Sequence, residues 1–207
     1  MRFLLINGSP HKEGTTSAAL AEFARILKEE GAESETVQIG NLAIRGCTAC
    51  MYCKKNGKCV ICDTVNEVAE RFAEADGIIV ASPVYYASPT GSVISFLDRL
   101  FFSTPFKKTM KLGASIVCAR RGGLSASFDV LNKYFAMSGM PIIPSTYWNQ
   151  VHGASSAEDA LLDEEGMQTV RNLARNAVFL ARSIELGKEH FGLPVEERNH
   201  RTNFIKR

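Results

Sequence analysis

Short apolar runs alternate along the chain with longer stretches in which apolar residues recur at helical spacing. The runs predict five β-strands, over residues 2–7, 35–39, 77–82, 112–118 and 140–147. The spaced stretches predict helices over residues 17–30, 64–75, 91–102, 124–137 and 163–186. This alternation is typical of a parallel sheet covered by helices on both faces. We expect one three-layer α/β domain over residues 1–190, and a polar tail or subunit-contacting arm over residues 191–207.

Three loops with suitable chemistry follow predicted strands, at residues 8–17, 82–90 and 119–124. Sheets of this kind bind ligands at the carboxyl ends of their strands. The three loops therefore predict one shared binding site.

The first loop leads from an apolar strand into a helix and carries the hydroxyl groups of Ser9, Thr15, Thr16 and Ser17. The start of a helix leaves backbone N–H groups unpaired at the positive end of the helix dipole, so it attracts phosphate. The loop lacks both the Gly-Lys-Ser/Thr ending of a Walker loop and the three glycines of a dinucleotide fingerprint. It favours a single terminal phosphate, such as that of flavin mononucleotide (FMN). The alternative is a serine-capped helix after a buried strand.

The second and third loops have the chemistry needed to hold a flat ring. The second is stiffened by prolines and presents apolar and aromatic side chains, through Pro83, Val84, Tyr85 and Tyr86. The third combines flexible glycines with positive charge, through Ala119, Arg120, Gly122 and Gly123. Positive charge near a flavin stabilises its anionic reduced form. Taken singly, each loop also has a simpler interpretation, as an aromatic core pair or as a plain surface turn.

In this order the three loops resemble those of the flavodoxin-like NAD(P)H-dependent FMN reductases, a family that includes the iron–sulfur flavoproteins. The resemblance covers residues 1 to about 185 and implies a five-stranded parallel sheet in the order 2-1-3-4-5. It implies that the loop from Gly8 to Ser17, with His11 and Lys12, binds the FMN phosphate. It also implies that residues 82–86 and 119–123 contact the ring. Family members are usually dimers or tetramers, so we expect a homodimer or homotetramer.

Five cysteines lie close together in the sequence, and four of them have a compact spacing: Cys47, Cys50, Cys53 and Cys59. Four such thiolates can ligate a [4Fe–4S] cluster, and the iron–sulfur flavoproteins carry a motif of this form. Cys62 is left without a role in that interpretation. Zinc is an alternative ligand for this spacing, and free or redox-labile thiols near the flavin are another.

The net charge of the chain and the lengths of its apolar runs indicate which classes of binding partner to expect. A net charge of +2 over 207 residues, with basic residues scattered, gives no indication of a nucleic-acid partner. The apolar runs are too short to span a bilayer or to form a signal peptide, so we expect a cytoplasmic protein without a membrane partner. Cys118 is interpreted as a core residue. Trp148 and His152 are interpreted as a packed tryptophan and a loop histidine on the ligand side of the sheet, with contact to the flavin or the substrate as the alternative.

The leading hypothesis is an FMN-dependent NAD(P)H oxidoreductase that passes electrons to a quinone, a free flavin, a nitro or azo compound, or a similar small acceptor. The first alternative is an iron–sulfur flavoprotein that relays single electrons from a ferredoxin-like donor. The second is a non-catalytic phosphate- or nucleotide-binding module. No catalytic side chain is expected, because the cofactor carries out hydride transfer.

Overall fold

A computed structural model describes residues 1–154, 156–200, 202 and 204 of the chain. Five parallel strands form the sheet in the order β2-β1-β3-β5-β6, with bounds β1 Arg2–Asn7, β2 Glu33–Gln38, β3 Gly77–Tyr85, β5 Leu112–Ala119 and β6 Gln150–His152. A sixth, two-residue strand, β4 Ser88–Pro89, folds back antiparallel on β3. The predicted order of the five parallel strands is confirmed.

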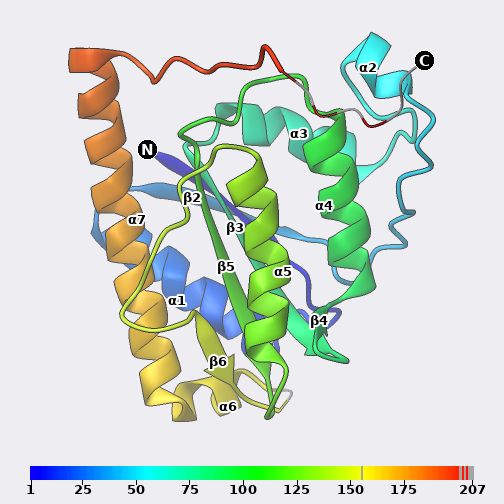
Figure 1. Cartoon of the computed structure of the whole chain (residues 1–207). Helices are drawn as coiled ribbons and strands as arrows, with labels where there is room; N and C mark the ends of the chain where they lie inside the picture. Colours follow the sequence, from blue (N-terminus) through cyan, green and yellow to red (C-terminus); the bar gives the residue numbers. More distant parts are fainter. Residues whose placement is uncertain (155, 201, 203, 205–207) are drawn as a thin grey trace.

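Helices cover both faces of the sheet (Figure 1). One face packs against α1 Thr15–Glu29, α6 Ala157–Leu162 and α7 Glu164–Phe191. The other packs against α3 Thr64–Glu74, α4 Gly91–Ser103 and α5 Leu124–Met137. The short helix α2, Tyr52–Asn56, lies outside these layers near the C-terminal end of α4. The predicted three-layer arrangement is therefore confirmed.

Strand β1 shows why the sheet is buried on both sides. Phe3 and Leu5 point into the core cluster shared with α1 and α7, whereas Leu4 and Ile6 point into the cluster shared with α3, α4 and α5. All four side chains are at most 2% exposed. Burying each such side chain contributes about 1.5–3 kcal/mol, so the continuous apolar run stabilises both layers.

The fifth parallel strand differs from the prediction. We predicted it over residues 140–147, but that segment makes only an isolated bridge between Gly113 and Ile142, and β6 begins at Gln150. Pro141 and Pro144 have no N–H to donate, and they interrupt the ladder there. The carboxyl end of this strand therefore presents Gly153 to the ligand side of the sheet.

The C-terminal segment follows α7, which continues to Phe191 instead of ending at residue 186 as predicted. After Gly192 the chain runs across the end of the sheet that lies away from β4 and β6 (Figure 1). There the Thr109 hydroxyl donates a hydrogen bond to the Glu196 carboxylate. Across the part of the chain that the structure describes, no helix is long and apolar enough to cross a membrane.

Candidate functional site

The three predicted loops meet around a cavity of about 270 Å³ at the carboxyl edge of the sheet. That volume is close to the lower end of the range for small-molecule sites, roughly 300–1,000 Å³. Most of the predicted flavin-contact residues line it: Ser9, His11, Thr15, Thr16, Pro83, Val84, Tyr85, Ala119 and Arg120. Segments far apart in the sequence therefore form one site.

Five predicted contact residues lie beside the cavity and do not line it: Lys12, Ser17, Tyr86, Gly122 and Gly123. Lys12 and Gly122 are exposed, and Tyr86 is fully exposed at the tip of the β3–β4 turn. Ser17 and Gly123 have structural contacts, described below. A direct role for these five in cofactor binding stays a prediction.

The first loop is closed by Asn7, a buried residue at the end of β1. Its Oδ1 accepts a hydrogen bond from the Ser9 N–H at 3.0 Å, and its Nδ2 donates to Ser17 Oγ at 2.7 Å. Ser9 Oγ in turn accepts from the His11 N–H at 3.1 Å. The sequence analysis missed Asn7, although a polar residue ending a buried strand is a signal that could have identified it.

The N-terminus of α1 opens into the cavity without a side-chain cap. Its N-cap residue is Gly14, and the first turn contains no acidic residue. The first N–H groups of a helix need a partner, and an anion provides one. Thr15 and Thr16 are both buried there, and Thr15 Oγ1 donates to the Ser156 carbonyl at 3.1 Å. This end of the cavity therefore fits a phosphate.

The second loop is fastened to the first by two hydroxyl groups. Ser82 Oγ accepts a hydrogen bond from the Thr90 N–H at 3.0 Å, and Thr90 Oγ1 donates to the Gly8 carbonyl at 3.2 Å. Gly8 leaves no room for a side chain, because a Cβ there would lie 2.1 Å from Val93 Cγ2. The first and second loops are therefore held in fixed positions relative to each other.

The third loop packs against the second through Gly123, whose φ is +87°. A Cβ at this position would lie 2.9 Å from the Ala87 Cα, so a larger residue would push the two loops apart. Arg120 lines the cavity, whereas Arg121 does not. One of the two arginines is thus placed to meet negative charge on a ligand.

Four lining residues were not predicted as contacts: Gly14, Cys118, Gly153 and Ala154. Cys118 is 3% exposed, and burial raises the pKa of its thiol to about 12, so it is neutral at physiological pH. Gly153 directly follows β6, and this position after the last strand could have identified it as a lining residue. Trp148 and His152 do not line the cavity, and His152 contacts Asp163.

A second, small cavity, of about 20 Å³, brings together the four predicted metal ligands. It is lined by Cys47, Cys50, Cys53 and Cys59, and Cys62 does not line it. We call this the cysteine cavity. Besides the thiols its wall contains apolar residues, Thr48, Ser103 and one buried guanidinium, that of Arg99. Arg99 Nε donates to Cys59 Sγ at 3.3 Å.

The residues of the cysteine cavity fit an iron–sulfur cluster in number and kind. Four thiols on one short segment are the donor set of a [4Fe–4S] cluster, and the buried guanidinium of Arg99 donates a hydrogen bond to one of them. Among the described residues no three His, Cys, Asp or Glu side chains are grouped to hold a metal ion.

Arg99 and Asp63 form an ion pair beside this cavity, with N–O distances of 2.7 and 2.8 Å. Burial alone would raise the pKa of Asp63, but hydrogen bonds from Arg99 and from the Val65 N–H hold the pKa below its usual value. The carboxylate therefore stays charged opposite the guanidinium.

The strand β4 and the helix α2 lie near opposite ends of α4 (Figure 1), and the two cavities are next to these ends. Thr90, at the start of the helix, contacts the first loop, whereas the Phe102 carbonyl lies 3.9 Å from Cys53 Sγ. Twelve residues of helix at 1.5 Å each separate these positions by about 18 Å. Within one chain the cysteines are therefore not part of the flavin site, contrary to the expectation that free thiols would lie near the flavin.

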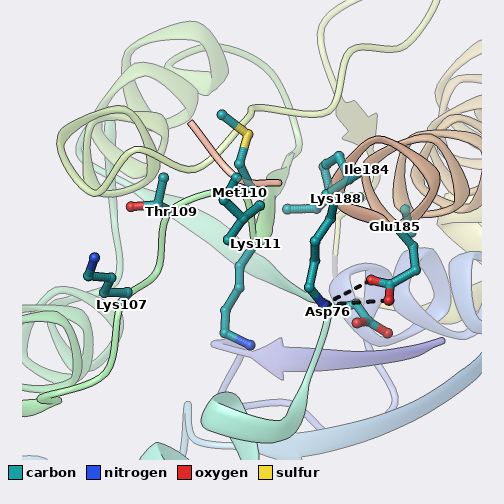
Figure 2. Close-up of a pocket in the computed structure, with 11 residues that line it drawn as sticks. Asp76, Lys107, Thr109, Met110, Lys111, Ile184, Glu185 and Lys188 are labelled. Carbon is teal, nitrogen blue, oxygen red and sulfur yellow. Dashed lines mark hydrogen bonds and ion pairs between the residues drawn. The ribbon is translucent and has the colours of Figure 1, made fainter. Parts of the chain in front are cut away.

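A third cavity, of about 210 Å³, lies between α7 and the start of β5 (Figure 2). Lys188 pairs there with Glu185, with an N–O distance of 3.3 Å. Lys111 donates to the carbonyl groups of Ala73 and Ala75, at the end of α3. These charged groups have partners within the chain, and none of the predicted site residues lies here.

Comparisons with known proteins agree with this geometry. The sequence model of the NADPH-dependent FMN reductase family matches residues 1–154. An iron–sulfur flavoprotein of Methanosarcina thermophila is 30% identical over 193 residues, covering 91% of this chain and 100% of that protein. Another, of Archaeoglobus fulgidus, is 38% identical over 149 residues, covering 71% of this chain and 67% of that protein.

Solved structures show the same fold. A flavone reductase has a TM-score of 0.67 at 20% identity, covering 89% of this chain and 64% of that one. A flavodoxin from the domain Archaea has a TM-score of 0.60 at 12% identity, covering 88% of this chain and 99% of that one. These neighbours show that the chain has a flavodoxin-like fold.

The chain belongs to the NADPH-dependent FMN reductase family, as the sequence resemblance indicated. It is a flavin-dependent oxidoreductase, and its FMN-reductase-like enzyme class is confirmed. This sets aside the alternative hypothesis of a non-catalytic module.

Proposed function

We propose that this chain is an iron–sulfur flavoprotein, which binds FMN between its three loops and a [4Fe–4S] cluster in the cysteine cavity. The main observation behind the proposal is which of the cysteines line the cysteine cavity. Cys47, Cys50, Cys53 and Cys59 line it together, whereas Cys62 stays outside. The names of the similar relatives support the same function. The alternative hypothesis of the sequence analysis is thereby preferred over the leading one.

For FMN, the chain provides an anion site at one end of the cavity and an apolar wall at the other. The uncapped N-terminus of α1 and the Ser9 hydroxyl would bind the phosphate. Pro83 and Val84 would exclude water from one side of the ring, and Arg120 would stabilise negative charge on it.

For a cluster, the chain would provide four cysteine ligands and a buried N–H donor, that of Arg99, to one of them. Bound in these two cavities, FMN supplies two-electron exchange with a nicotinamide, and the cluster supplies one-electron exchange with a ferredoxin-like donor or an acceptor. The contacts of Thr90 with Gly8 and of Cys53 with Phe102, near the two ends of α4, support two separate sites. It also keeps Cys118 neutral in the flavin cavity, so this thiol does not compete as a nucleophile.

A second candidate function is a simple NAD(P)H oxidoreductase with FMN alone, passing electrons to a quinone, flavin, nitro or azo compound. The match of residues 1–154 to the reductase family favours it. In this case the exposed thiols of Cys47 and Cys50 would be free. The preference for NADH or NADPH is tested by steady-state kinetics with both nicotinamides and a panel of these acceptors.

Metal and flavin analysis of protein purified without oxygen tests the proposal. We expect about four iron atoms, about four sulfides and one FMN per chain. Cys59→Ser should lose the iron, and Cys62→Ser, the matched control outside the cavity, should keep it. Both variants should keep FMN, because the two sites are separate. Flavin without iron would support the second candidate, and one zinc ion per chain would contradict both.

We also propose a homodimer or homotetramer, as in the family that the loops resemble. Light scattering of the flavin-loaded protein measures this directly. A monomer at micromolar concentration would contradict it.

A further inference from the structure

Arg99 is a buried cation on α4 that the sequence analysis did not single out. It is 1% exposed, and its neighbours on the helix, such as Phe96 and Leu100, belong to the apolar core. A buried guanidinium is costly unless it is paired, and apolar side chains often replace buried ion pairs without loss of stability. Core packing therefore gives no reason for arginine here.

Every N–H donor of Arg99 has an acceptor. Two bind the Asp63 carboxylate, and the remaining three bind the Arg45 carbonyl at 3.3 Å, the Ile61 carbonyl at 3.0 Å and Cys59 Sγ at 3.3 Å. Arg45 comes two residues before the first cysteine of the motif, and Ile61 comes two residues after Cys59. Arg99 thus holds the chain on both sides of the cysteine run.

Cys59 is also held from α3, through its backbone. The Cys59 N–H donates to Asn66 Oδ1 at 3.1 Å, and Asn66 Nδ2 donates to the Cys59 carbonyl at 3.0 Å. Asp63, the partner of Arg99, is the N-cap of the same helix and accepts from the Val65 N–H. Two helices therefore fix Cys59: α3 holds its backbone, and α4 holds its sulfur.

We propose that Arg99 is a positioning residue for the iron–sulfur cluster: it orders the cysteine segment around Cys59, and its Nε–H···Sγ bond raises the reduction potential of the cluster. This inference rests on the proposed function. A hydrogen bond to a ligand sulfur stabilises the more negative, reduced state more than the oxidised state. Because Asp63 balances the charge of Arg99, the hydrogen bond is the main source of the effect.

The variants Arg99→Lys and Arg71→Lys test this in holoprotein prepared without oxygen. Arg71 is the matched control, because it is an ion-paired arginine on α3 that donates to the Glu35 carboxylate at 2.8 Å and not to a sulfur. We measure the midpoint potential of the cluster by electron paramagnetic resonance during redox titration, and iron and FMN content by chemical analysis. Arg99→Lys should shift the midpoint to a more negative value and reduce the iron retained, with FMN unchanged. Arg71→Lys should leave the midpoint at the wild-type value.

An unchanged midpoint at full iron content in Arg99→Lys, or an equal shift in Arg71→Lys, would overturn the inference. A measurement on the wild type remains decisive if Arg99→Lys does not fold. With 15N-labelled arginine, pulsed electron paramagnetic resonance of the reduced protein should show coupling to an arginine nitrogen, and its absence would overturn the inference. Wild-type protein without iron and sulfide would instead contradict the proposed function, and with it this inference.

Discussion

The Asn7 side chain joins the two ends of the first loop, residues 8–17. Its Nδ2 donates to Ser17 Oγ at 2.7 Å, and its Oδ1 accepts a hydrogen bond from the Ser9 N–H. Asn7 is 3% exposed, so water does not replace these bonds. The loop that faces the ligand is therefore shaped by a residue that does not itself line the cavity.

We predict that Asn7→Ala weakens both the fold and FMN binding. Leaving the Ser9 N–H and the Ser17 hydroxyl without their partner should lower the free energy of unfolding by about 1–3 kcal/mol. Urea denaturation of the apoprotein measures this, and flavin fluorescence titration should show a higher FMN dissociation constant. Ser17→Ala removes the partner of Nδ2 and keeps the bond from the Ser9 N–H to Oδ1, so a stability loss as large as in Asn7→Ala would contradict the role given to Oδ1.

Gly153 sits against the first loop, where a Cβ would lie 2.7 Å from Thr15 Oγ1. We expect Gly153→Ala to displace Thr15 and to weaken FMN binding, with overpacking of about 1–3 kcal/mol. Gly187→Ala is the control, because that glycine lies within α7 with nothing within 4 Å. It should raise stability by about 0.5–1 kcal/mol without changing FMN affinity. Equal affinities in wild type and Gly153→Ala would show that Thr15 does not bind the cofactor.

The two neighbouring arginines of the third loop should behave differently. Arg120→Ala removes a cation from the cavity wall, and we expect the FMN dissociation constant to rise about threefold to tenfold, which is about 0.7–1.4 kcal/mol. Arg121→Ala, which changes a residue outside the wall, should leave it unchanged. Isothermal titration calorimetry at fixed salt compares the two. If both substitutions had the same effect, general surface charge would explain it.

Much of this architecture was predictable because it is encoded locally. Apolar runs placed β1, β3 and β5 within a few residues, and the three loops follow directly from the chain order of strands and helices. Gly8 and the hydroxyl residues of the first loop could be recognised because they lie within a few positions of one another in the sequence. The four cysteines of the cysteine cavity were likewise identifiable from spacing alone.

The features that were missed depend on distant contacts. Arg99 meets Asp63 across 36 residues, and Thr15 meets Gly153 only after the sheet has formed. The fifth strand was misplaced because Pro141 and Pro144 remove donors that an apolar pattern does not reveal. The distance between the cysteine cavity and the flavin loops also follows from tertiary structure, because α4 separates them.

The buried thiol of Cys118 predicts a pH dependence of stability. Its pKa rises in the folded chain from about 9 to about 12, so between these values the unfolded chain loses a proton that the folded chain keeps. The free energy of unfolding should therefore fall with rising pH, by at most about 1.4 kcal/mol per unit, and show no contribution below pH 9. Denaturation of wild type and Cys118→Ala across this range isolates the effect. Cys62→Ala, at an exposed thiol, should retain the wild-type slope.

The uncapped start of α1 has a consequence for the life of the protein in the cell. An anion that satisfies those N–H groups binds the folded chain and not the unfolded one, so each tenfold excess of free FMN over its dissociation constant adds about 1.4 kcal/mol to stability. Chains made while riboflavin is scarce would unfold more often and meet proteases sooner. Vitamin supply would then set how much of this protein accumulates.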